Sequence, residues 1–353
     1  MKQPPVTVLV TGAGSFCGVN IIHSLRHAGG YRIIAADIVA LSAGLFLADR
    51  AYVIPKEGPD GAYIGALLDI CRQEAVQALV PGFDTELPYL SSARAEFAAL
   101  GVVPVIGDPE FIEIANCKQS TQQFLQGHGF PSLRSYRWEE KGRAIDELGL
   151  PLVVKPRQAW GARGFSVVWT KERLEQAVLD VLEAGWQPLV QEYVPDTEGE
   201  FTSSVMVATD YDVLGSICMR RELEKGSTRR IFVDRFQELR GQVEAIACAL
   251  KTRGPVNLQF RVKDGRPYVF EFNARFSTTN VVRAVAGFNE VAVLVRNYLT
   301  GEKQRIKDYT PMVAVMYQDY VYAEPGGYEA LLERGAGDRI GHLQNALETR
   351  NGA

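Results

Sequence analysis

The stretch that decides the fold is Val256-Asn-Leu-Gln-Phe-Arg-Val262, then Lys263-Asp-Gly-Arg266, then Pro267-Tyr-Val-Phe-Glu-Phe-Asn-Ala-Arg275. Two alternating runs joined by Asp-Gly predict a pair of strands with a tight turn. Because side chains alternate along a strand, each strand has one polar face. These faces carry Asn257, Gln259 and Arg261 on the first strand, and Glu271, Asn273 and Arg275 on the second.

The pairing register of this hairpin decides whether the two polar faces form one site. A regular two-residue turn would place Gln259 opposite Phe270, which belongs to the other face. One extra residue would place Gln259 opposite Glu271 instead. A single site made of both faces therefore requires a bulge or a three-residue connection, which we predict for this hairpin. The alternative is an ordinary amphipathic hairpin with a polar outer face.

Oxygen donors of this kind suit Mg²⁺, which takes few protein ligands and completes its shell with phosphates and water. Gln259 followed by Glu271-Phe-Asn273-Ala-Arg275 resembles the metal-binding end of the ATP-grasp superfamily, in its carbamoyl-phosphate-synthase-like branch of carboxylate–amine ligases. The resemblance implies that Gln259, Glu271 and Asn273 hold Mg²⁺ or Mn²⁺. It also implies that Arg275 contacts the transferring phosphate or the substrate carboxylate.

Other motifs follow the order that this family shows over about residues 1–300. The resemblance assigns Lys118 and Lys155 to the phosphates of ATP, and a small-residue lid loop at 158–164 to the triphosphate. It assigns the hinge after Pro188 to adenine and ribose. The implied nucleotide contacts are Lys118, Lys155, Gly161, Arg163, Gly164, Gln191, Glu192, Val194 and Glu200. Taken singly, each charged residue could equally be a solvated surface residue.

Four arginines lie in the segment between the hinge and the hairpin. Arginine suits bidentate binding of carboxylate or phosphate. We expect one of Arg220, Arg221, Arg229 and Arg230 to serve the transferred phosphate, and we favour Arg220 or Arg221.

The N-terminal third begins as a βαβ unit, because the apolar run 6–10 leads into Gly12-x-Gly14-x-x-x-Gly18 and a helical pattern. Asp37 ends the second strand, where dinucleotide-binding folds hold a ribose hydroxyl. A dehydrogenase would also need a helical Tyr-x-x-x-Lys pair, and the match at Tyr52–Lys56 comes too early and contains a proline. The alternative is a glycine turn that lets the helix pack. The resemblance implies instead that this domain helps to hold the second substrate, with Gly14 and Ser15 in contact.

Asp84 and Glu86 follow the strand that ends at Pro81. Ligands of open α/β sheets bind at the carboxyl ends of strands, so either carboxylate could bind a substrate amine. Asp84 or Thr85 is also a good N-cap for a helix expected over 87–99. A further helix is expected over 110–126, with Lys118 inside it.

Composition excludes several functional classes. The 353 residues carry a net charge of −4 without a basic stripe, which argues against a nucleic-acid partner. No apolar run is long enough to span a bilayer, and the N-terminus lacks a signal-peptide core. The five cysteines are scattered, so a reduced, cytoplasmic protein is expected.

The expected fold class is α/β, with an α+β C-terminal part. We expect a Rossmann-like parallel-sheet domain at 1–109, a lid at 110–188, an antiparallel-sheet domain at 189–310, and a strand and tail at 311–353. The resemblance implies an ATP-dependent, ADP-forming ligase that joins a small carboxylate, such as an amino acid, to an amine through an acyl phosphate. It is also consistent with a homodimer. The alternatives are carboxylation through carboxyphosphate, an NAD(P)-binding oxidoreductase and a non-catalytic nucleotide-binding protein.

Overall fold

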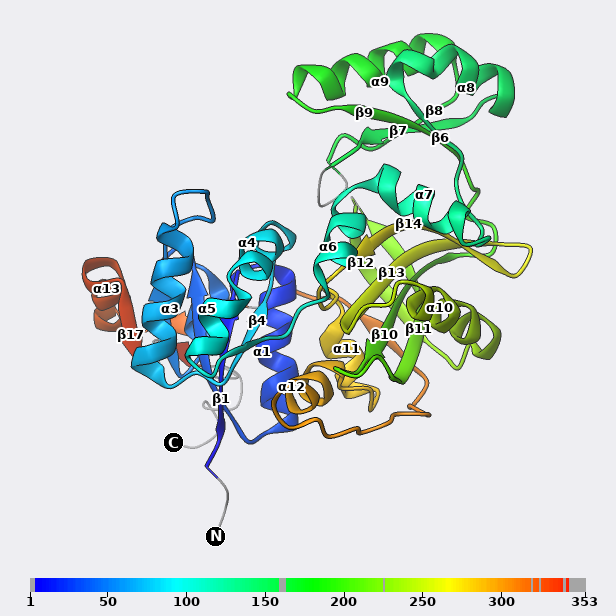
Figure 1. Cartoon of the computed structure of the whole chain (residues 1–353). Coiled ribbons are helices and arrows are strands. Elements are labelled where there is room, and N and C mark those ends of the chain that lie inside the picture. The colour runs from blue at the N-terminus through cyan, green and yellow to red at the C-terminus, as the bar shows by residue number, and fades with distance from the viewer. Residues whose placement is uncertain are drawn as a thin grey trace, which may run out of the picture.

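The computed structural model describes residues 4–158, 163–224, 226–318, 320–323, 325–338 and 341–342. They form two six-stranded sheets, one four-stranded sheet and a two-stranded ribbon, with helices packed on the larger sheets (Figure 1). The expected combination of a parallel N-terminal sheet with antiparallel sheets in the later part of the chain is confirmed. Within the described residues, no helix combines the length and the apolar character that crossing a membrane requires.

The N-terminal sheet is parallel except at one edge, and its strand order is β17-β3-β2-β1-β4-β5. Its central strands are apolar on both faces, which is typical of a sheet covered by helices on both sides. Val8, Leu9 and Val10 are fully buried. Its strands are β1 (Val6–Thr11), β2 (Tyr31–Asp37), β3 (Arg50–Val53), β4 (Ala78–Pro81), β5 (Val103–Pro104) and β17 (Ala336–Asp338).

Helix α1 (Phe16–Ala28) begins where Ser15 caps it, since the Ser15 side chain accepts a hydrogen bond from the Gly18 amide. It ends at Gly29, whose φ of 70° suits glycine. The remaining helices of this part are α2 (Ala43–Leu47), α3 (Ala62–Glu74), the short 3₁₀ helix η1 (Asp84–Glu86), α4 (Leu87–Ser92) and α5 (Arg94–Ala99).

The four-stranded sheet, in the order β6-β9-β7-β8, carries two helices and lies above the rest of the molecule in Figure 1. Its apolar residues, including Leu152, Val154 and Val190, form a core of their own. We call this unit the lid. It consists of β6 (Ser135–Arg137), η2 (Trp138–Glu140), α8 (Lys141–Leu148), β7 (Leu152–Pro156), β8 (Ser166–Val168), α9 (Lys171–Glu183) and β9 (Pro188–Glu192).

The second six-stranded sheet is antiparallel, in the order β14-β13-β10-β11-β12-β15. Helices α6 (Pro109–Asn116) and α7 (Lys118–Gly127) pack against β14, and α10 (Gln237–Ala249) packs against β10, β11 and β14. The strands are β10 (Glu200–Val207), β11 (Val213–Glu224), β12 (Ser227–Val233), β13 (Gly254–Lys263), β14 (Arg266–Asn273) and β15 (Met312–Val315). The sheet is followed along the chain by α11 (Asn280–Val285), α12 (Glu290–Thr300), β16 (Tyr322–Ala323), α13 (Pro325–Arg334) and β18 (Gly341–His342).

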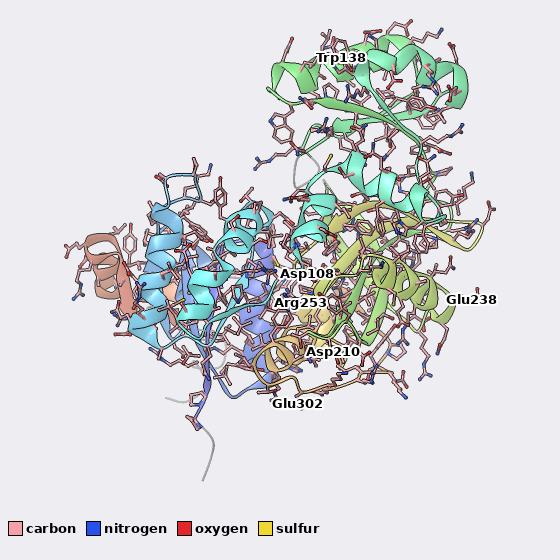
Figure 2. All side chains as sticks on the ribbon, viewed as in Figure 1. Asp108, Trp138, Asp210, Glu238, Arg253 and Glu302 are labelled. Carbon is pink, nitrogen blue, oxygen red and sulfur yellow. The ribbon has the colours of Figure 1, made fainter. Side chains whose placement is uncertain are left out.

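The N-terminal and antiparallel sheets share their apolar cores. One core joins Val8 and Val10 to Phe288 and Val291 of the later part, and a second joins Leu9 to Phe272. An ion pair also links the two parts, because Asp108 accepts a hydrogen bond from Arg253 Nε at 2.9 Å (Figure 2). These contacts fix the N-terminal sheet against the antiparallel sheet, whereas the lid packs within itself.

Two helix predictions need correction. The helix expected over 87–99 is two short helices that meet at Ala93, where Arg94 turns to donate to the carbonyl oxygens of Ile106 and Gly107. The helix expected over 110–126 is interrupted at Cys117, whose backbone is extended, so Lys118 begins α7 rather than lying inside a longer helix. In both cases a long-range contact interrupts a helical pattern. The Lys118 amide, for example, donates to the carbonyl oxygen of Arg157.

Candidate active site

The β13–β14 hairpin has the bulge that the sequence predicts. Lys263 pairs with Arg266 across a two-residue turn, and the register shifts between Gln259 and Phe260. The shift places Gln259 opposite Glu271 and Asn257 opposite Asn273. Phe270 is the extra residue that a bulge leaves without a partner. The two polar faces therefore form one surface.

This surface is part of the wall of a cavity of about 490 Å³ between the lid, the antiparallel sheet and α1. The predicted site residues that line it come from the lid and the hinge after it, from α7, from β10, β11, β13 and β14, and from the segments after β4 and β14. They are Asp84, Lys118, Lys155, Arg163, Gln191, Glu192, Val194, Glu200, Arg221, Gln259, Glu271, Asn273 and Arg275. Elements that are far apart in the sequence thus bring most of the predicted set together.

Lys155 is buried at the end of β7, with 6 % of its surface exposed. Its ammonium lies 5.9 Å from the centre of the Phe270 ring. Burial lowers the pKa of Lys155 to about 7, the charge of Lys118 acts in the same direction, and Glu271 opposes them. A buried lysine beside a second lysine is poorly stabilised by the protein alone, and it would be stabilised by an anionic ligand such as a phosphate.

Glu200 holds two arginines on the cavity wall. Its Oε1 accepts from Arg221 at 2.8 Å, and its Oε2 accepts from Arg261 at 3.2 Å. Arg221 also donates to Gln259 Oε1 at 2.8 Å, and Arg261 donates to the carbonyl oxygen of Val194 at 2.7 Å. These bonds connect the hinge to the hairpin. The ribose contact implied for Glu200 stays a prediction.

Arg275 is held by Asp84 across the boundary between the two large sheets. Its Nε and Nη2 donate to Asp84 Oδ2 at 2.9 and 2.7 Å, and Nη2 also donates to Asn273 Oδ1 at 3.1 Å. Neither Asp84 nor Thr85 caps a helix, so the capping interpretation is wrong. Asp84 Oδ2 accepts both hydrogen bonds from Arg275, and Thr85 donates to Glu57.

Gln259, Glu271 and Asn273 form a donor set of one carboxylate and two amide oxygens. Within the described ranges there is no group of three or more His, Cys, Asp or Glu side chains that could hold a metal ion by themselves. The set fits Mg²⁺, because Mg²⁺ usually takes one or two carboxylates and obtains its remaining ligands from phosphates and water. Asn273 Nδ2 is buried and has no hydrogen-bond partner among the described residues, so it remains available to donate to an anionic ligand such as a phosphate beside the metal.

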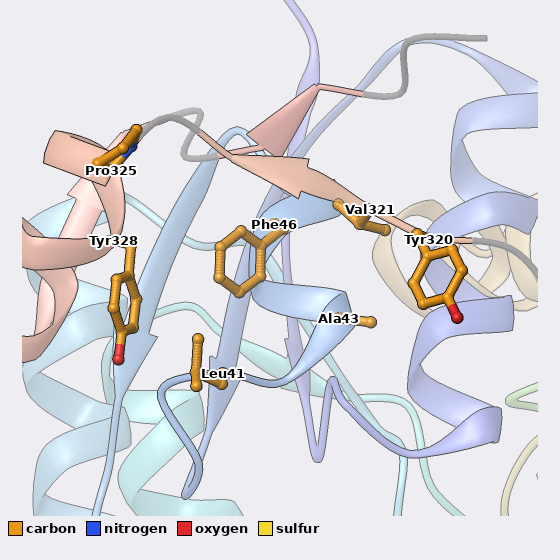
Figure 3. A pocket seen from close by; sticks show the side chains of 7 residues that line it. All are labelled: Leu41, Ala43, Phe46, Tyr320, Val321, Pro325 and Tyr328. Carbon is orange, nitrogen blue, oxygen red and sulfur yellow. The ribbon is translucent and has the colours of Figure 1, made fainter. Parts of the chain in front are cut away.

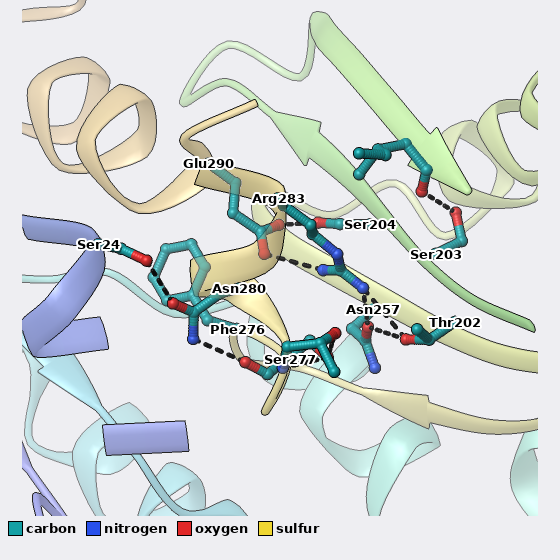
Figure 4. Close-up of polar contacts among 12 residues, drawn as sticks. Ser24, Thr202, Ser203, Ser204, Asn257, Phe276, Ser277, Asn280, Arg283 and Glu290 are labelled. Carbon is teal, nitrogen blue, oxygen red and sulfur yellow. Dashed lines mark hydrogen bonds and ion pairs between the residues drawn. The ribbon is translucent and has the colours of Figure 1, made fainter. Parts of the chain in front are cut away.

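A buried polar network lies beside this surface, on the same face of β10 and β13 (Figure 4). Arg283 and Glu290 form a fully buried ion pair at 2.8 Å. Arg283 Nη2 also donates to Asn257 Oδ1 and to Thr202 Oγ1, both at 3.1 Å. Asn257 lies opposite Asn273 in the hairpin, so the network fixes the strand that carries Gln259.

Several predicted residues do not line the cavity. Arg220 points to the other side of β11, where its guanidinium stacks on Phe232 at 4.1 Å from the ring centre. Gly164 and Ser15 are not among the lining residues either, and Ser15 instead caps α1. Gly161 lies outside the described residues.

The glycine loop after β1 is filled by the chain itself. The Gly14 amide donates to Asp37 Oδ2 at 2.7 Å, and a Cβ at Gly14 would lie 2.3 Å from Ser42 Cβ. Asp37 therefore closes the loop, and Ser42 leaves no room for a pyrophosphate there. This geometry supports the packing interpretation of the glycines over dinucleotide binding.

Glu86 is buried behind the same loop rather than in the cavity. Its carboxylate accepts hydrogen bonds from Thr11 and from Tyr63. Burial raises the pKa of Glu86 to about 8, opposed by these hydrogen bonds and assisted by Glu57 and Asp37. Its contacts make it a structural acid of the N-terminal sheet, so the structure does not bring it to the substrate side.

Sequence reasoning missed several cavity residues. Arg261 carried a signal, since it follows Gln259 by two positions and shares its face. Phe16, Asn20, Thr278 and Thr279 carried none, because only the packing of α1 against the segment after β14 brings them together. A second cavity, of about 540 Å³, is lined by Leu41, Ala43, Phe46, Tyr320, Val321, Pro325 and Tyr328 (Figure 3). Its lining has no charged side chain, so it offers no groups for phosphoryl transfer.

Two family models match separate parts of the chain. Residues 8–106 match a model described as PylC-like, N-terminal domain. Residues 187–320 match one described as ATP-grasp in the biosynthetic pathway with Ter operon. The second match contains the hinge, both arginines of β11 and the whole β13–β14 hairpin.

Curated relatives include the carbamoyl phosphate synthase large chains of Thermomicrobium roseum and Vibrio cholerae. The first is 26 % identical over 314 residues and the second 26 % identical over 318. The alignments cover 79 % and 86 % of this chain, but only 28 % and 29 % of those proteins. The chain therefore spans less than a third of the length of these relatives.

Solved structures share the fold. The ADP complex of an N5-carboxyaminoimidazole ribonucleotide synthetase superposes with a TM-score of 0.71 at 16 % identity, and covers 95 % of this chain and 86 % of that one. The biotin carboxylase domain of Hydrogenobacter thermophilus 2-oxoglutarate carboxylase, solved with MgADP and bicarbonate, gives 0.66 at 19 % identity. That match covers 88 % of this chain and 72 % of the other.

Proposed function

We propose that this chain, which belongs to the ATP-grasp superfamily, is an ATP-dependent, ADP-forming carboxylate–amine ligase. The observation that carries the proposal is the bulged pairing of Gln259 with Glu271 in one cavity with Lys155 and Arg275. That cavity combines cations for a triphosphate, oxygen donors for a divalent metal and an arginine for a second anion.

The lid and hinge residues would bind the nucleotide. The lining includes apolar Leu133, Val153 and Tyr193 beside the backbone of Val194, which suits an adenine ring. Lys118 and Lys155 would pair with the phosphates, and Arg221 would hold Gln259 in register. Catalysis by such a site is largely positioning and charge stabilisation.

Gln259, Glu271 and Asn273 would hold Mg²⁺ or Mn²⁺, which supplies positive charge beside the β- and γ-phosphates. Arg275 would orient the acid whose oxygen receives the γ-phosphoryl group. The resulting acyl phosphate would be attacked by an amine, releasing phosphate and forming the amide. Asp84, which lines the cavity and is bonded to Arg275, would accept the proton that the amine loses.

The test is release of ADP from Mg·ATP across a matrix of amino acids and small carboxylic acids, each with and without amines. Release that requires both an acid and an amine would establish the ligase. Release that requires bicarbonate would establish carboxylation instead. Release with neither, or an absence of Mg·ATP binding, would contradict the proposal.

Glu271→Ala should abolish turnover while leaving the fold intact, because it removes the single carboxylate of the donor set. Glu222→Ala is the matched control, since Glu222 is a carboxylate of β11 outside the cavity. Turnover by both variants should be compared with their far-UV circular dichroism and thermal melting. If a folded Glu271→Ala protein kept ordinary ATP-dependent turnover, Glu271 would not be a required metal ligand.

A further inference from the structure

One wall of the cavity belongs to neither the lid nor the hairpin. It is formed by Phe16 and Asn20 of α1, Asp84 after β4, and Thr278 and Thr279 after β14. We call these five residues the α1 wall. Arg275 adjoins it through Asp84, so a molecule on this wall would lie beside the residue proposed to orient the acid.

The topology of the N-terminal sheet places the α1 wall where a ligand is expected. The chain runs from β1 to β2 and β3 on one side, and to β4 and β5 on the other. Ligands of open α/β sheets bind outside the carboxyl ends of the strands at such a switch point. Phe16 and Asp84 follow the carboxyl ends of β1 and β4, the two strands that flank it.

Asp84 offers this wall an unused acceptor. Both of its bonds to Arg275 end on Oδ2, and Oδ1 accepts no hydrogen bond from any described residue. Asp84 lines the cavity, so a ligand there can reach this oxygen. A carboxylate oxygen that a ligand removes from water is stabilised by a hydrogen-bond donor. An ammonium or amine N–H group can supply that donor.

Phe16 offers an apolar surface beside that acceptor. It is 66 % exposed, whereas Ile21, Ile22 and Leu25 of the same helix are fully buried. The helix is fixed in place, because Cys17 donates to the carbonyl oxygen of Phe276 at 3.0 Å and Asn20 donates to that of Thr278. An apolar group that covers an exposed ring at the edge of a cavity binds favourably, because apolar surface is removed from water.

We propose that the α1 wall binds the amine substrate, and that this amine carries an aromatic or aliphatic group. The amine nitrogen donates to Asp84 Oδ1, and its apolar group packs on the Phe16 ring. Phe16 is then a specificity-determining residue. This inference rests on the proposed function, since it identifies the chemical class of the amine that the same site would use.

The test uses the full chain saturated with Mg·ADP, titrated with phenethylamine, ethanolamine or 2-phenylethanol in a calorimeter. Phenethylamine should bind at least tenfold more tightly than ethanolamine, and 2-phenylethanol, which has neither an amine nor a carboxylate, should bind more weakly than phenethylamine. Phe16→Ala should reduce the preference to less than threefold, and Asp84→Asn should weaken both amines. Phe16→Leu should keep part of the preference, and Leu41→Ala, an equally exposed apolar residue outside this cavity, should keep all of it.

An ethanolamine affinity equal to that of phenethylamine would overturn the inference, as would an undiminished preference in a folded Phe16→Ala protein. Mg·ADP binding is measured separately on the same samples. Normal Mg·ADP binding without the amine preference leaves the proposed function in place and removes the inference. If Mg·ADP does not bind, the proposed function fails. The amine titration without nucleotide then still decides whether the α1 wall binds an apolar amine.

Discussion

Arg220 and Arg221 are neighbours in the sequence and have opposite environments in the structure. Arg221 lies in the cavity and is bonded to Glu200 and Gln259. Arg220 stacks on Phe232 outside it and is 40 % exposed. The alternation of β11 separates them, so the weak preference for either arginine becomes a preference for Arg221 alone.

Arg221→Ala should lower kcat/KM for ATP by at least tenfold, because the buried Glu200 and the partly buried Gln259 lose a charged partner worth ~1.5–3 kcal/mol. Arg220→Ala should change the same constant by less than threefold. Steady-state kinetics of the two variants check this. An equal loss of kcat/KM in the two variants would contradict the prediction that only the arginine facing the cavity contributes.

Lys155 gives the nucleotide site a predicted pH dependence. Its pKa of about 7 means that the lysine is charged below pH 7 and neutral above it. Phosphates bind the charged form, so the Kd for Mg·ADP should rise about tenfold between pH 6 and pH 8. The arginine of Lys155→Arg stays charged, so the rise in Kd should be smaller in this variant. Any remaining pH dependence would then come from the ionisation of the nucleotide itself. Parallel profiles for the two proteins would exclude Lys155 as the titrating group.

Among the elements, the hairpin shows how one residue sets a register. Phe270 is the extra residue of a bulge that brings Glu271 opposite Gln259. Without that shift Glu271 would fall out of line with Gln259. The polar residues of the two strands therefore form one site only because the bulge aligns them.

The lid is the element that we expect to unfold by itself, because its core shares no residue with the other two. Leu152→Ala removes a fully buried lid side chain and should destabilise the lid by ~2–5 kcal/mol. Hydrogen exchange should accelerate in peptides from 135–192 and stay unchanged in β1 and β13. The KM for ATP should rise because the lid lines the cavity. Acceleration throughout the molecule would contradict an independent lid.

At the scale of the whole molecule, the N-terminal and antiparallel sheets share their cores, so we expect them to unfold as one body. Their cores are shared, and α1 is bonded to the segment after β14 through Cys17, Asn20 and Ser24. The tail also joins both sheets, since β15 extends the antiparallel sheet and β17 the N-terminal one. The boundaries at 109, 188 and 310 stay predictions.

Phe288→Ala should lower the stability of both sheets together, by ~3–5 kcal/mol, because Phe288 is fully buried in the shared core. Exchange should accelerate in β1 as well as in β10, although Phe288 belongs to neither. The Leu152→Ala protein is the control, since its effect should stay in the lid. Two separate melting transitions for the two sheets would show that the shared core does not couple them.

The sequence by itself determined the hairpin, its bulge and the order of the cationic and oxygen-donor residues, because alternation and spacing along a strand are local properties. The fold class came from the buried run at 6–10 together with the resemblance of the later motifs to the ATP-grasp family. The tertiary structure decided which residues meet. It turned Asp84 from a helix cap into the partner of Arg275, buried Glu86 behind the glycine loop, filled that loop with Ser42, and brought Phe16 to the cavity. These outcomes depend on contacts between residues up to 259 positions apart, which no local pattern contains.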